Sequence, residues 1–179
     1  VIPSNPYDTK GLLASAIQDP DPVIFYEPMR IYRAIKQDIP EKEYFVPLGK
    51  ANVVQEGDDL TLIAWGSMLK TCMDAIEKLN SKYSVELIDL RTINPYDAET
   101  VINSVKKTGK CVIVHEAIRT CGFAAELIAS INEKALLSLE APVVRVTSPD
   151  IPFPLAKLEN YFLPDANRVI KGIEKVMSF

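Results

Sequence analysis

The sequence KCVIVHEAIRTCGFAAE, residues 110–126, decides the fold. Its apolar run at residues 112–114 predicts a buried strand, the polar residues after that run predict a turn, and the small and apolar residues at its end predict the start of a helix. The only histidine of the chain, His115, directly follows the apolar run. Because ligands of open α/β sheets bind outside the carboxyl ends of the strands, His115 is the first candidate for chemistry.

Strand and helix patterns alternate along most of the chain. Apolar runs of four to six residues predict further strands at residues 60–65, 85–90 and 143–146. Apolar residues at helical spacing predict an amphipathic helix after each strand. This alternation is typical of an α/β fold with a mostly parallel sheet and helices on both faces. The order of the strands cannot be read from the pattern.

Polar residues and a glycine indicate where these helices begin and end. Ser67 is expected to cap the first of them. Asn94 or Asp97 is expected to cap the next helix, which should stop at Gly109. Asp165 is expected to cap the last helix.

The beginning of the chain has its own pattern. Ser4 or Asn5 is expected to cap a helix whose first residue is Pro6. Apolar residues 1–3 and 23–26 predict strands on either side of this helix, and therefore a βαβ unit with parallel strands. The chain starts within a predicted strand and without an initiator methionine, so we expect a fragment of a longer polypeptide.

Two connections interrupt the regular order. Periodicity breaks down at residues 33–50, where prolines and mixed charges predict a linker between two domains. Residues 52–56 and 60–65 flank the turn residues Gly57-Asp58-Asp59. This arrangement predicts either a hairpin or a tight bend between two strands.

The composition argues against several classes of protein. The net charge is −4, the pI is about 5.1, and lysines and arginines are scattered along the sequence, so a nucleic-acid partner is not expected. No apolar run approaches the roughly 20 residues of a membrane span. The three cysteines lack metal-site spacing and predict neither a disulfide framework nor a zinc site. We therefore expect the cytoplasm, or the mitochondrial matrix for a eukaryotic source.

Five blocks of sequence carry a resemblance to a known family. They are IPSNPYDTKGLLASAIQDPDPVIFYEPMRIYR, PLGKANVVQEGDDLTLIAWG, IDLRTINPYD, KTGKCVIVHEAIRTCGFAAE and APVVRVTSPDIPFPLAKLENYFLPD. In order and spacing they resemble the carboxyl-terminal half of the β subunit of thiamine-diphosphate-dependent 2-oxo acid dehydrogenases. These subunits belong to the decarboxylating components of the pyruvate and branched-chain 2-oxo acid dehydrogenase complexes. Two blocks, YEPMRIYR and HEAIRTCGFAAE, look more like branched-chain or broad-specificity enzymes.

The resemblance implies a domain organisation and a parent complex. Residues 1–32 would be the tail of the pyrimidine-binding domain, residues 33–50 a linker, and residues 51–179 a transketolase carboxyl-terminal domain. The parent complex would bind thiamine diphosphate and Mg²⁺ through the α subunit and upstream segments, and no cofactor is expected on this fragment. Expected partners are the α subunit, a second β subunit, and the subunit-binding and lipoyl domains of the acyltransferase component. The fragment itself would be an inactive assembly and dimerisation module.

Three places in the sequence are candidates for chemistry, each with a structural alternative. His115 and Glu116 are either an acid–base pair or a hydrogen-bonded strand end, and on a strand the two side chains would point to opposite faces. Residues 119–122 either present N–H groups to an anion or cap the following helix, with Gly122 allowing a tight approach. The same two alternatives apply to Gly66-Ser67.

The segment YEPMRIYR supplies the remaining low-ranked catalytic candidates. Glu27, Arg30 and Tyr32 lie where a predicted strand runs into a proline-containing loop, a position from which substrate-channel residues project. The resemblance places this loop at the end of the pyrimidine-binding domain. A salt bridge at a domain boundary explains these residues equally well.

Four acidic groups near the carboxyl end are candidates for a partner interface. They are Glu140, Glu159, Asp165 and the carboxylate of Phe179. Together they would offer a negative surface to the small basic binding domain of the acyltransferase component. The alternative is a solvated acidic face. A different class of function, a flavodoxin-like nucleotide-binding module, also fits the α/β pattern.

Overall fold

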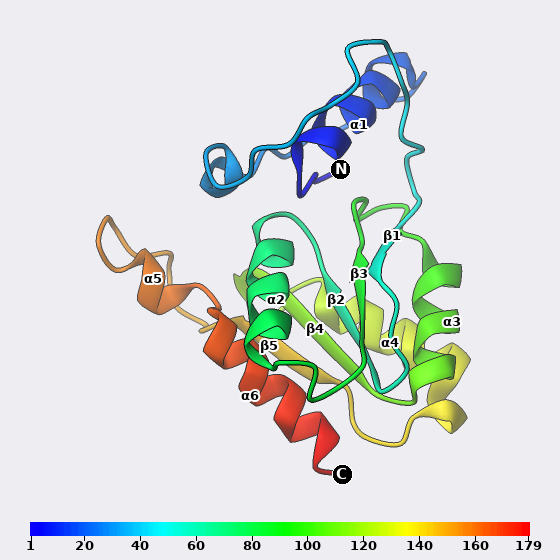
Figure 1. Ribbon diagram of the computed structural model, residues 1–179, viewed down its shortest axis with the longest axis vertical. Coiled ribbons are helices and arrows are strands. Elements are labelled where there is room, and N and C mark those ends of the chain that lie inside the picture. Colours follow the sequence, from blue (N-terminus) through cyan, green and yellow to red (C-terminus); the bar gives the residue numbers. More distant parts are fainter.

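The computed structural model describes all 179 residues and has two parts (Figure 1). Residues 1–50 contain helix α1 (Pro6–Gln18) and the short 3-10 helix η1 (Met29–Ile31). The rest forms a sheet covered by helices. Its elements in chain order are β1 (Asn52–Gln55), β2 (Leu60–Ala64), α2 (Ser67–Lys78), β3 (Val85–Asp89), α3 (Ala98–Thr108), β4 (Cys111–Ile118), α4 (Ala124–Ala135), η2 (Leu136–Ser138), β5 (Val144–Ser148), α5 (Glu159–Phe162) and α6 (Ala166–Met177).

The sheet has five strands in the order β1-β3-β2-β4-β5. Strands β2, β3, β4 and β5 run parallel to their neighbours, and only β1 is antiparallel, to β3. One hydrophobic core lies between the sheet and helices α2 and α6, and a second lies between the sheet and helices α3 and α4. The predicted α/β class, with a mostly parallel sheet and helices on both faces, is confirmed.

Of the two arrangements predicted for the connection between β1 and β2, the structure has the tight bend and not the hairpin. The two strands do not pair with each other, because β3 lies between them and pairs with both. The chain therefore crosses the start of β3 in a tight bend. Gly57 makes this crossing possible, since a Cβ there would lie 2.2 Å from the carbonyl carbon of Val85. A turn pattern alone does not reveal that a third strand will insert.

Most of the predicted helix ends are correct. Asn5, Asp97 and Asp165 each accept a hydrogen bond from a backbone N–H of the first helical turn, and Gly109 ends α3 in the left-handed conformation. The prediction for Ser67 is wrong. Helix α2 is preceded by Gly66, at φ +57°, and the Ser67 hydroxyl donates to Glu116 on β4.

The beginning of the chain forms the predicted helix but not the predicted strands. No strand is found at residues 1–3 or 23–26. These two segments nevertheless lie side by side, because the Val1 amino group donates to the Ile24 carbonyl at 2.8 Å and the Tyr26 N–H donates to the Val1 carbonyl at 2.8 Å. With only this short contact, and no further strand beside them here, the segments stay extended without forming a sheet.

Candidate functional site

The carboxyl ends of the parallel strands face residues 1–50 (Figure 1). The N–H of Ile2 donates to the carbonyl of Arg91 at 2.8 Å, just after β3, and the N–H of Gly49 donates to the Thr92 hydroxyl at 3.0 Å. A Cβ at Gly66, after β2, would lie 2.9 Å from the Ile2 side chain. At the ends of β2 and β3, the edge of the sheet where α/β proteins usually bind ligands is therefore covered by the chain itself.

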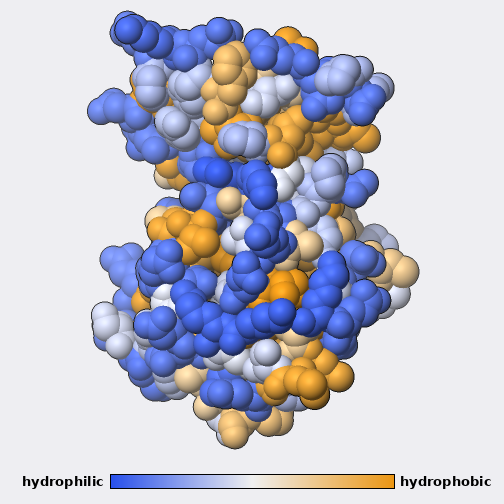
Figure 2. Space-filling view, turned by 90° about the vertical axis from the view of Figure 1, so that its right-hand side faces the viewer, coloured by the Kyte–Doolittle hydropathy of each residue, from blue (hydrophilic) through white to orange (hydrophobic).

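A constriction separates the two parts, with hydrophobic surface on both sides of it (Figure 2). A hollow of about 640 Å³ at this boundary is lined by residues of both parts, among them Val1, Tyr26, Leu48 and Ile93. The two parts thus meet over a limited area. Specific polar contacts then decide how they are held together.

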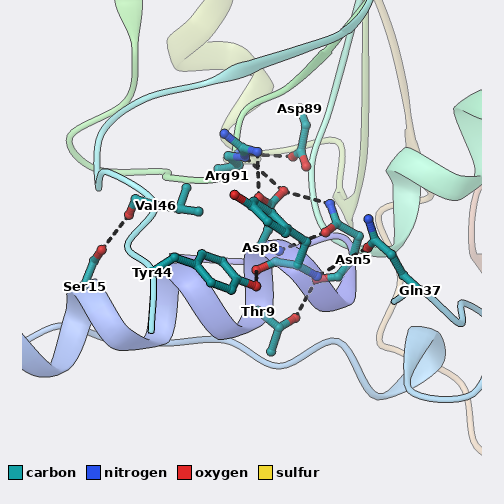
Figure 3. Close-up of polar contacts among 10 residues, drawn as sticks. Asn5, Asp8, Thr9, Ser15, Gln37, Tyr44, Val46, Asp89 and Arg91 are labelled. Atoms are coloured by element: carbon teal, nitrogen blue, oxygen red, sulfur yellow. Dashed lines mark hydrogen bonds and ion pairs between the residues drawn. The ribbon is translucent and has the colours of Figure 1, made fainter. Parts of the chain in front are cut away.

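One buried ion pair joins α1 to the end of β3 (Figure 3). Arg91 Nη2 donates to Asp8 Oδ1 at 2.6 Å, and Arg91 Nε donates to Asp8 Oδ2 at 3.0 Å. The Asp8 side chain is fully buried and that of Arg91 is 14% exposed. Asn5 Nδ2 also donates to Asp8 Oδ2, at 2.7 Å. A two-point arginine–carboxylate contact of this kind fixes orientation as well as distance.

This pair was not predicted from the sequence. Its two residues are 83 positions apart, and Asp8 lies in the first turn of α1, where an acidic residue is common for local reasons. The available signal is the spacing of Asp8 and Leu12, which places a carboxylate on the same face of α1 as a buried leucine. A carboxylate on a buried face needs a partner, and Arg91 follows a strand end directly.

Asp89 lies next to this ion pair and is itself buried. Burial raises the pKa of Asp89 to about 7, and the negative charge of Asp8 also raises it, against the opposing effects of the Ser4 hydroxyl and Arg91. Asp89 Oδ1 accepts from the Arg91 N–H at 3.2 Å, while Oδ2 has no hydrogen-bond partner. Near neutral pH, Asp89 is therefore poised between its charged and neutral forms.

The segment at residues 33–50 is packed along α1 (Figure 3). The ring of Tyr44 stacks on that of Tyr7 with centroids 4.5 Å apart, and the Tyr44 hydroxyl donates to the Tyr7 carbonyl at 2.9 Å. The Ser15 hydroxyl donates to the Val46 carbonyl at 2.7 Å. The segment has no helix or strand from residue 35 to residue 50, and these contacts hold it against the helix.

His115 is buried at the end of β4, with 1% of its surface exposed. Its ring stacks on Trp65, with centroids 5.5 Å apart, and neither ring nitrogen has a hydrogen-bond partner. Burial lowers the pKa of His115 to about 4, with a further lowering by Arg145. A Cβ at Gly122 would lie 2.5 Å from the ring, so the glycine permits the tight approach expected at this turn.

Glu116 does not meet His115. Strand β4 continues to Ile118, so the two side chains leave it on different faces, as expected for neighbours on a strand. Glu116 accepts from the Ser67 hydroxyl at the start of α2, whereas His115 lies against Trp65 on the side of α4. Burial raises the pKa of Glu116, and the charge of Arg30 opposes this effect. The fold thus brings Glu116 to Ser67, and it does not bring His115 and Glu116 together as an acid–base pair.

The candidates in YEPMRIYR are largely exposed. The Tyr32 hydroxyl donates to Glu27, which raises the pKa of Tyr32, and Arg30 Nη2 donates to Asn160 Oδ1 at 3.5 Å. Arg30 is also close enough to Glu116 to lower the pKa of that carboxyl. Glu27 and Tyr32 line a groove of about 620 Å³ beside α1, together with Leu13 and other apolar residues.

The turn at residues 119–122 is satisfied within the chain. The Thr120 N–H and hydroxyl both donate to the Asp150 carboxylate, each at 2.8 Å, which lowers the pKa of Asp150. Helix α4 starts after Phe123 without a side-chain cap, and Cys121 has φ +57°. The anion that meets this turn is therefore a carboxylate of the protein itself.

The four predicted interface groups do not form one surface. Glu159 and Asp165 lie near the start of α6, and Asp165 caps that helix. Phe179 lies beyond its other end, roughly 18 Å away at the rise of an α-helix. Glu140 forms an ion pair with Lys110, at 2.9 Å. A partner touching all four would have to extend along the whole of α6.

Nowhere do three His, Cys, Asp or Glu side chains lie close enough together to hold a metal ion. All three thiols are free, and burial raises the pKa of Cys72 and Cys111. None of the helices is both long and apolar enough to cross a membrane.

The comparisons with known proteins agree with this fold. Residues 49–169 match the family described as "Transketolase, C-terminal domain". The pyruvate dehydrogenase E1 component subunit beta of Acholeplasma laidlawii is 52% identical over 177 residues, which cover 98% of this chain and 54% of that protein. The same subunit of Bacillus subtilis is 48% identical over 180 residues, which cover 100% of this chain and 55% of that protein.

A solved structure shows the same fold at lower identity. The split gene transketolase, described as an inactive beta4 tetramer, has a TM-score of 0.79 and 24% identity, covering 99% of this chain and 56% of that one. The present chain spans about half the length of the curated relatives, and it is homologous to the carboxyl-terminal part of those subunits. It therefore belongs to the transketolase C-terminal domain family.

Proposed function

We propose that residues 51–179 act as a scaffold that holds residues 1–50 in place within the β subunit of a 2-oxo acid dehydrogenase. One observation carries this proposal. At the ends of β2 and β3, the edge of the sheet at which related architectures bind ligands is covered by residues 1–50, which the Asp8–Arg91 pair fixes in orientation. The domain's role is then to position the segment containing Glu27 and Arg30, and it carries no catalytic centre of its own.

The parent enzyme would decarboxylate a 2-oxo acid on thiamine diphosphate and pass the acyl group to a lipoyl carrier. The names of the curated relatives favour pyruvate over a branched-chain substrate. Residues 1–32 would be the end of the pyrimidine-binding domain, with residues 33–50 as the linker. Thiamine diphosphate, Mg²⁺, the α subunit, a second β subunit and the acyltransferase component would complete the assembly, as the similarity to pyruvate dehydrogenase E1 beta subunits implies.

Calorimetric titration of the purified chain tests this proposal. We expect no tight binding of thiamine diphosphate with Mg²⁺, and none of FMN, because the ligand edge of the sheet is covered. Tight FMN binding would support an independent flavodoxin-like nucleotide binder and overturn the assignment. Tight thiamine diphosphate binding would show that the cofactor site lies in this chain. In the complete enzyme, an Arg91→Ala substitution should impair turnover and loosen residues 1–50, as measured by amide hydrogen exchange.

A further inference from the structure

A groove between β5 and α6 gathers positive charge. It has a volume of about 450 Å³ and is lined by five cationic side chains, those of Arg119, Arg145, Arg168, Lys171 and Lys175. The sole acidic residue in its lining, Asp150, is already bound by Thr120. The whole chain has a net charge of −4, so this surface is opposite in sign to the molecule that carries it. Cations scattered in the sequence thus meet in the fold.

None of the five cations forms an ion pair with an acidic residue. Two of them serve the fold, because Arg145 donates to the Arg119 carbonyl at 3.2 Å and Arg168 donates to the Phe162 carbonyl at 3.1 Å. The exposed ammonium groups of Lys171 and Lys175 have no hydrogen-bond partner in the chain. They are free to bind something else.

The cations of α6 lie on one face of that helix. Arg168, Lys171 and Lys175 follow one another at spacings of three and four residues, so they lie on one face. Like charges at this spacing destabilise a helix by a few tenths of a kcal/mol per pair. Gly172 lies on the same face and brings it close to the sheet, since a Cβ there would lie 2.6 Å from Val146 Cγ2.

The groove follows the outer edge of the sheet. Strand β5 is the last in the strand order, and consecutive residues from 144 to 150 line the groove. Successive side chains of a strand point to opposite faces of the sheet. Consecutive residues can therefore all line one groove only if the groove runs along the edge of β5. An extended segment lying along this edge would run beside the cations of α6.

The spacing of the charges matches an extended peptide better than a compact anion. From Arg168 to Lys175 the helix rises about 10 Å, which is more than a single phosphate can bridge. Lys171 and Lys175 are four residues apart, with Cβ atoms about 6 Å from each other. Alternate residues of an extended chain point to the same side and are about 6.6 Å apart. Carboxylates on alternate residues would therefore face these two lysines in register.

We propose that the β5–α6 groove binds an extended, carboxylate-rich segment of a partner protein, with acidic side chains on alternate residues facing Lys171 and Lys175. The positive charge of the groove favours a partner with acidic side chains, and the edge of the sheet favours a partner segment in an extended conformation. A second copy of this chain pairing through the same edge is disfavoured, because it would bring two basic grooves together. The proposal is independent of the function proposed above.

The test uses a fluorescent ten-residue peptide of alternating Glu and Thr and measures its binding to the purified chain by fluorescence anisotropy. The double substitution Lys171→Glu/Lys175→Glu should weaken binding by about tenfold or more, because two attractive contacts become repulsive. The matched control is Lys106→Glu/Lys134→Glu, which makes the same charge change at exposed positions on α3 and α4, on the other side of the sheet. It should leave binding within about twofold.

Two further probes make the outcome decisive. A peptide of the same composition, with its glutamates in one block, should bind more weakly, because fewer carboxylates fall in register with the lysines. Tripolyphosphate should compete poorly with the alternating peptide. Equal loss of binding in the two double variants, or no binding of the alternating peptide at all, would overturn the proposal. Displacement by tripolyphosphate at equal charge would also overturn it, in favour of a site for small polyanions. Circular dichroism checks that every variant is folded.

Discussion

The ends of two parallel strands in this protein, β3 and β4, use buried titratable groups in different ways. At the end of β3, Asp89 accepts a hydrogen bond from the Arg91 N–H, and the Arg91 guanidinium pairs with the Asp8 carboxylate of α1. This pair neutralises two charges that lie 83 residues apart in the sequence. At the end of β4, His115 lies against the Trp65 ring with both nitrogens unpartnered, and stays neutral. The first end joins two parts of the molecule, whereas the second packs a turn. A titratable residue at a strand end is thus no sufficient sign of catalysis.

The largest expected effect comes from breaking the ion pair at the end of β3. Asp8→Ala leaves Arg91 as a mostly buried charge without its partner, so the free energy of unfolding should fall by on the order of 3–5 kcal/mol, measured by urea denaturation. Lys50→Ala is the matched control, since its pair with Asp97 is long, at 3.8 Å, and the lysine is 60% exposed. That change should cost less than about 1 kcal/mol. Equal losses in the two variants would contradict the role given to Asp8.

The next effect concerns the tight packing at the end of β4. Gly122→Ala places a Cβ 2.5 Å from the His115 ring and 2.6 Å from the Ile118 carbonyl, so overpacking should cost about 1–3 kcal/mol in thermal or urea unfolding. At Gly49 the nearest atom to such a Cβ is 3.5 Å away, and only the positive φ of +72° opposes substitution. Gly49→Ala should therefore cost about 1 kcal/mol. A fully tolerated Gly122→Ala would show that the turn relaxes without the close contact.

The pH dependence of stability should separate the two strand ends by sign. The pKa of Asp89 is raised to about 7 in the folded state, so this group adds stability as pH falls from 7 toward 3.8. The pKa of His115 is lowered to about 4, so this group removes stability as pH falls from 6.5 toward 4. Each contributes a slope of up to about 1.4 kcal/mol per pH unit.

Single substitutions should uncover each slope in urea denaturation between pH 4 and 8. Asp89→Asn removes the group that adds stability as pH falls. The free energy of unfolding should therefore decrease more steeply with falling pH than in the unchanged chain. His115→Gln removes the group that lowers stability as pH falls. The free energy of unfolding should therefore decrease less with falling pH than in the unchanged chain, or increase. If both variants kept the pH profile of the unchanged chain, neither group would titrate differently in the folded and unfolded states.

The smallest effect is expected on catalysis. In the complete enzyme, His115→Gln should change kcat by less than about threefold, because the imidazole is buried against Trp65. The assay is acyl transfer from a 2-oxo acid, with assembly checked by size-exclusion chromatography. A collapse of turnover with folding and assembly intact would restore His115 as a catalytic residue.

Local patterns predicted local structure well. Asn5, Asp97 and Asp165 cap their helices as expected, since a capping bond joins residues two or three positions apart. The alternation of strands and helices also predicted the parallel sheet. Each apolar run indicates a buried strand from its own residues, without information from distant parts of the chain. Ser67 failed as a cap because Glu116, 49 residues away, takes its hydroxyl.

The candidate sites were harder to predict because their partners are distant in sequence. The separation of His115 and Glu116 follows from the alternation of a strand, but the Trp65 stack depends on which strand lies beside β4. The acidic groups predicted to supply part of a partner surface are far apart along α6, because Asp165 caps its start and Phe179 lies beyond its end. The basic groove went unnoticed, since its cations come from α6, β5 and the turn after β4.

The sequence by itself determined most of the elements of residues 51–179, most of the helix caps, the two-faced burial of the sheet and the family resemblance. These features depend on neighbours within a few residues or on side-chain periodicity. Only the tertiary structure decided that β3 inserts between β1 and β2, that residues 1–50 cover the carboxyl edge of the sheet, and that Asp8 meets Arg91. Those outcomes depend on strand order and on contacts between distant segments, which local propensity does not encode.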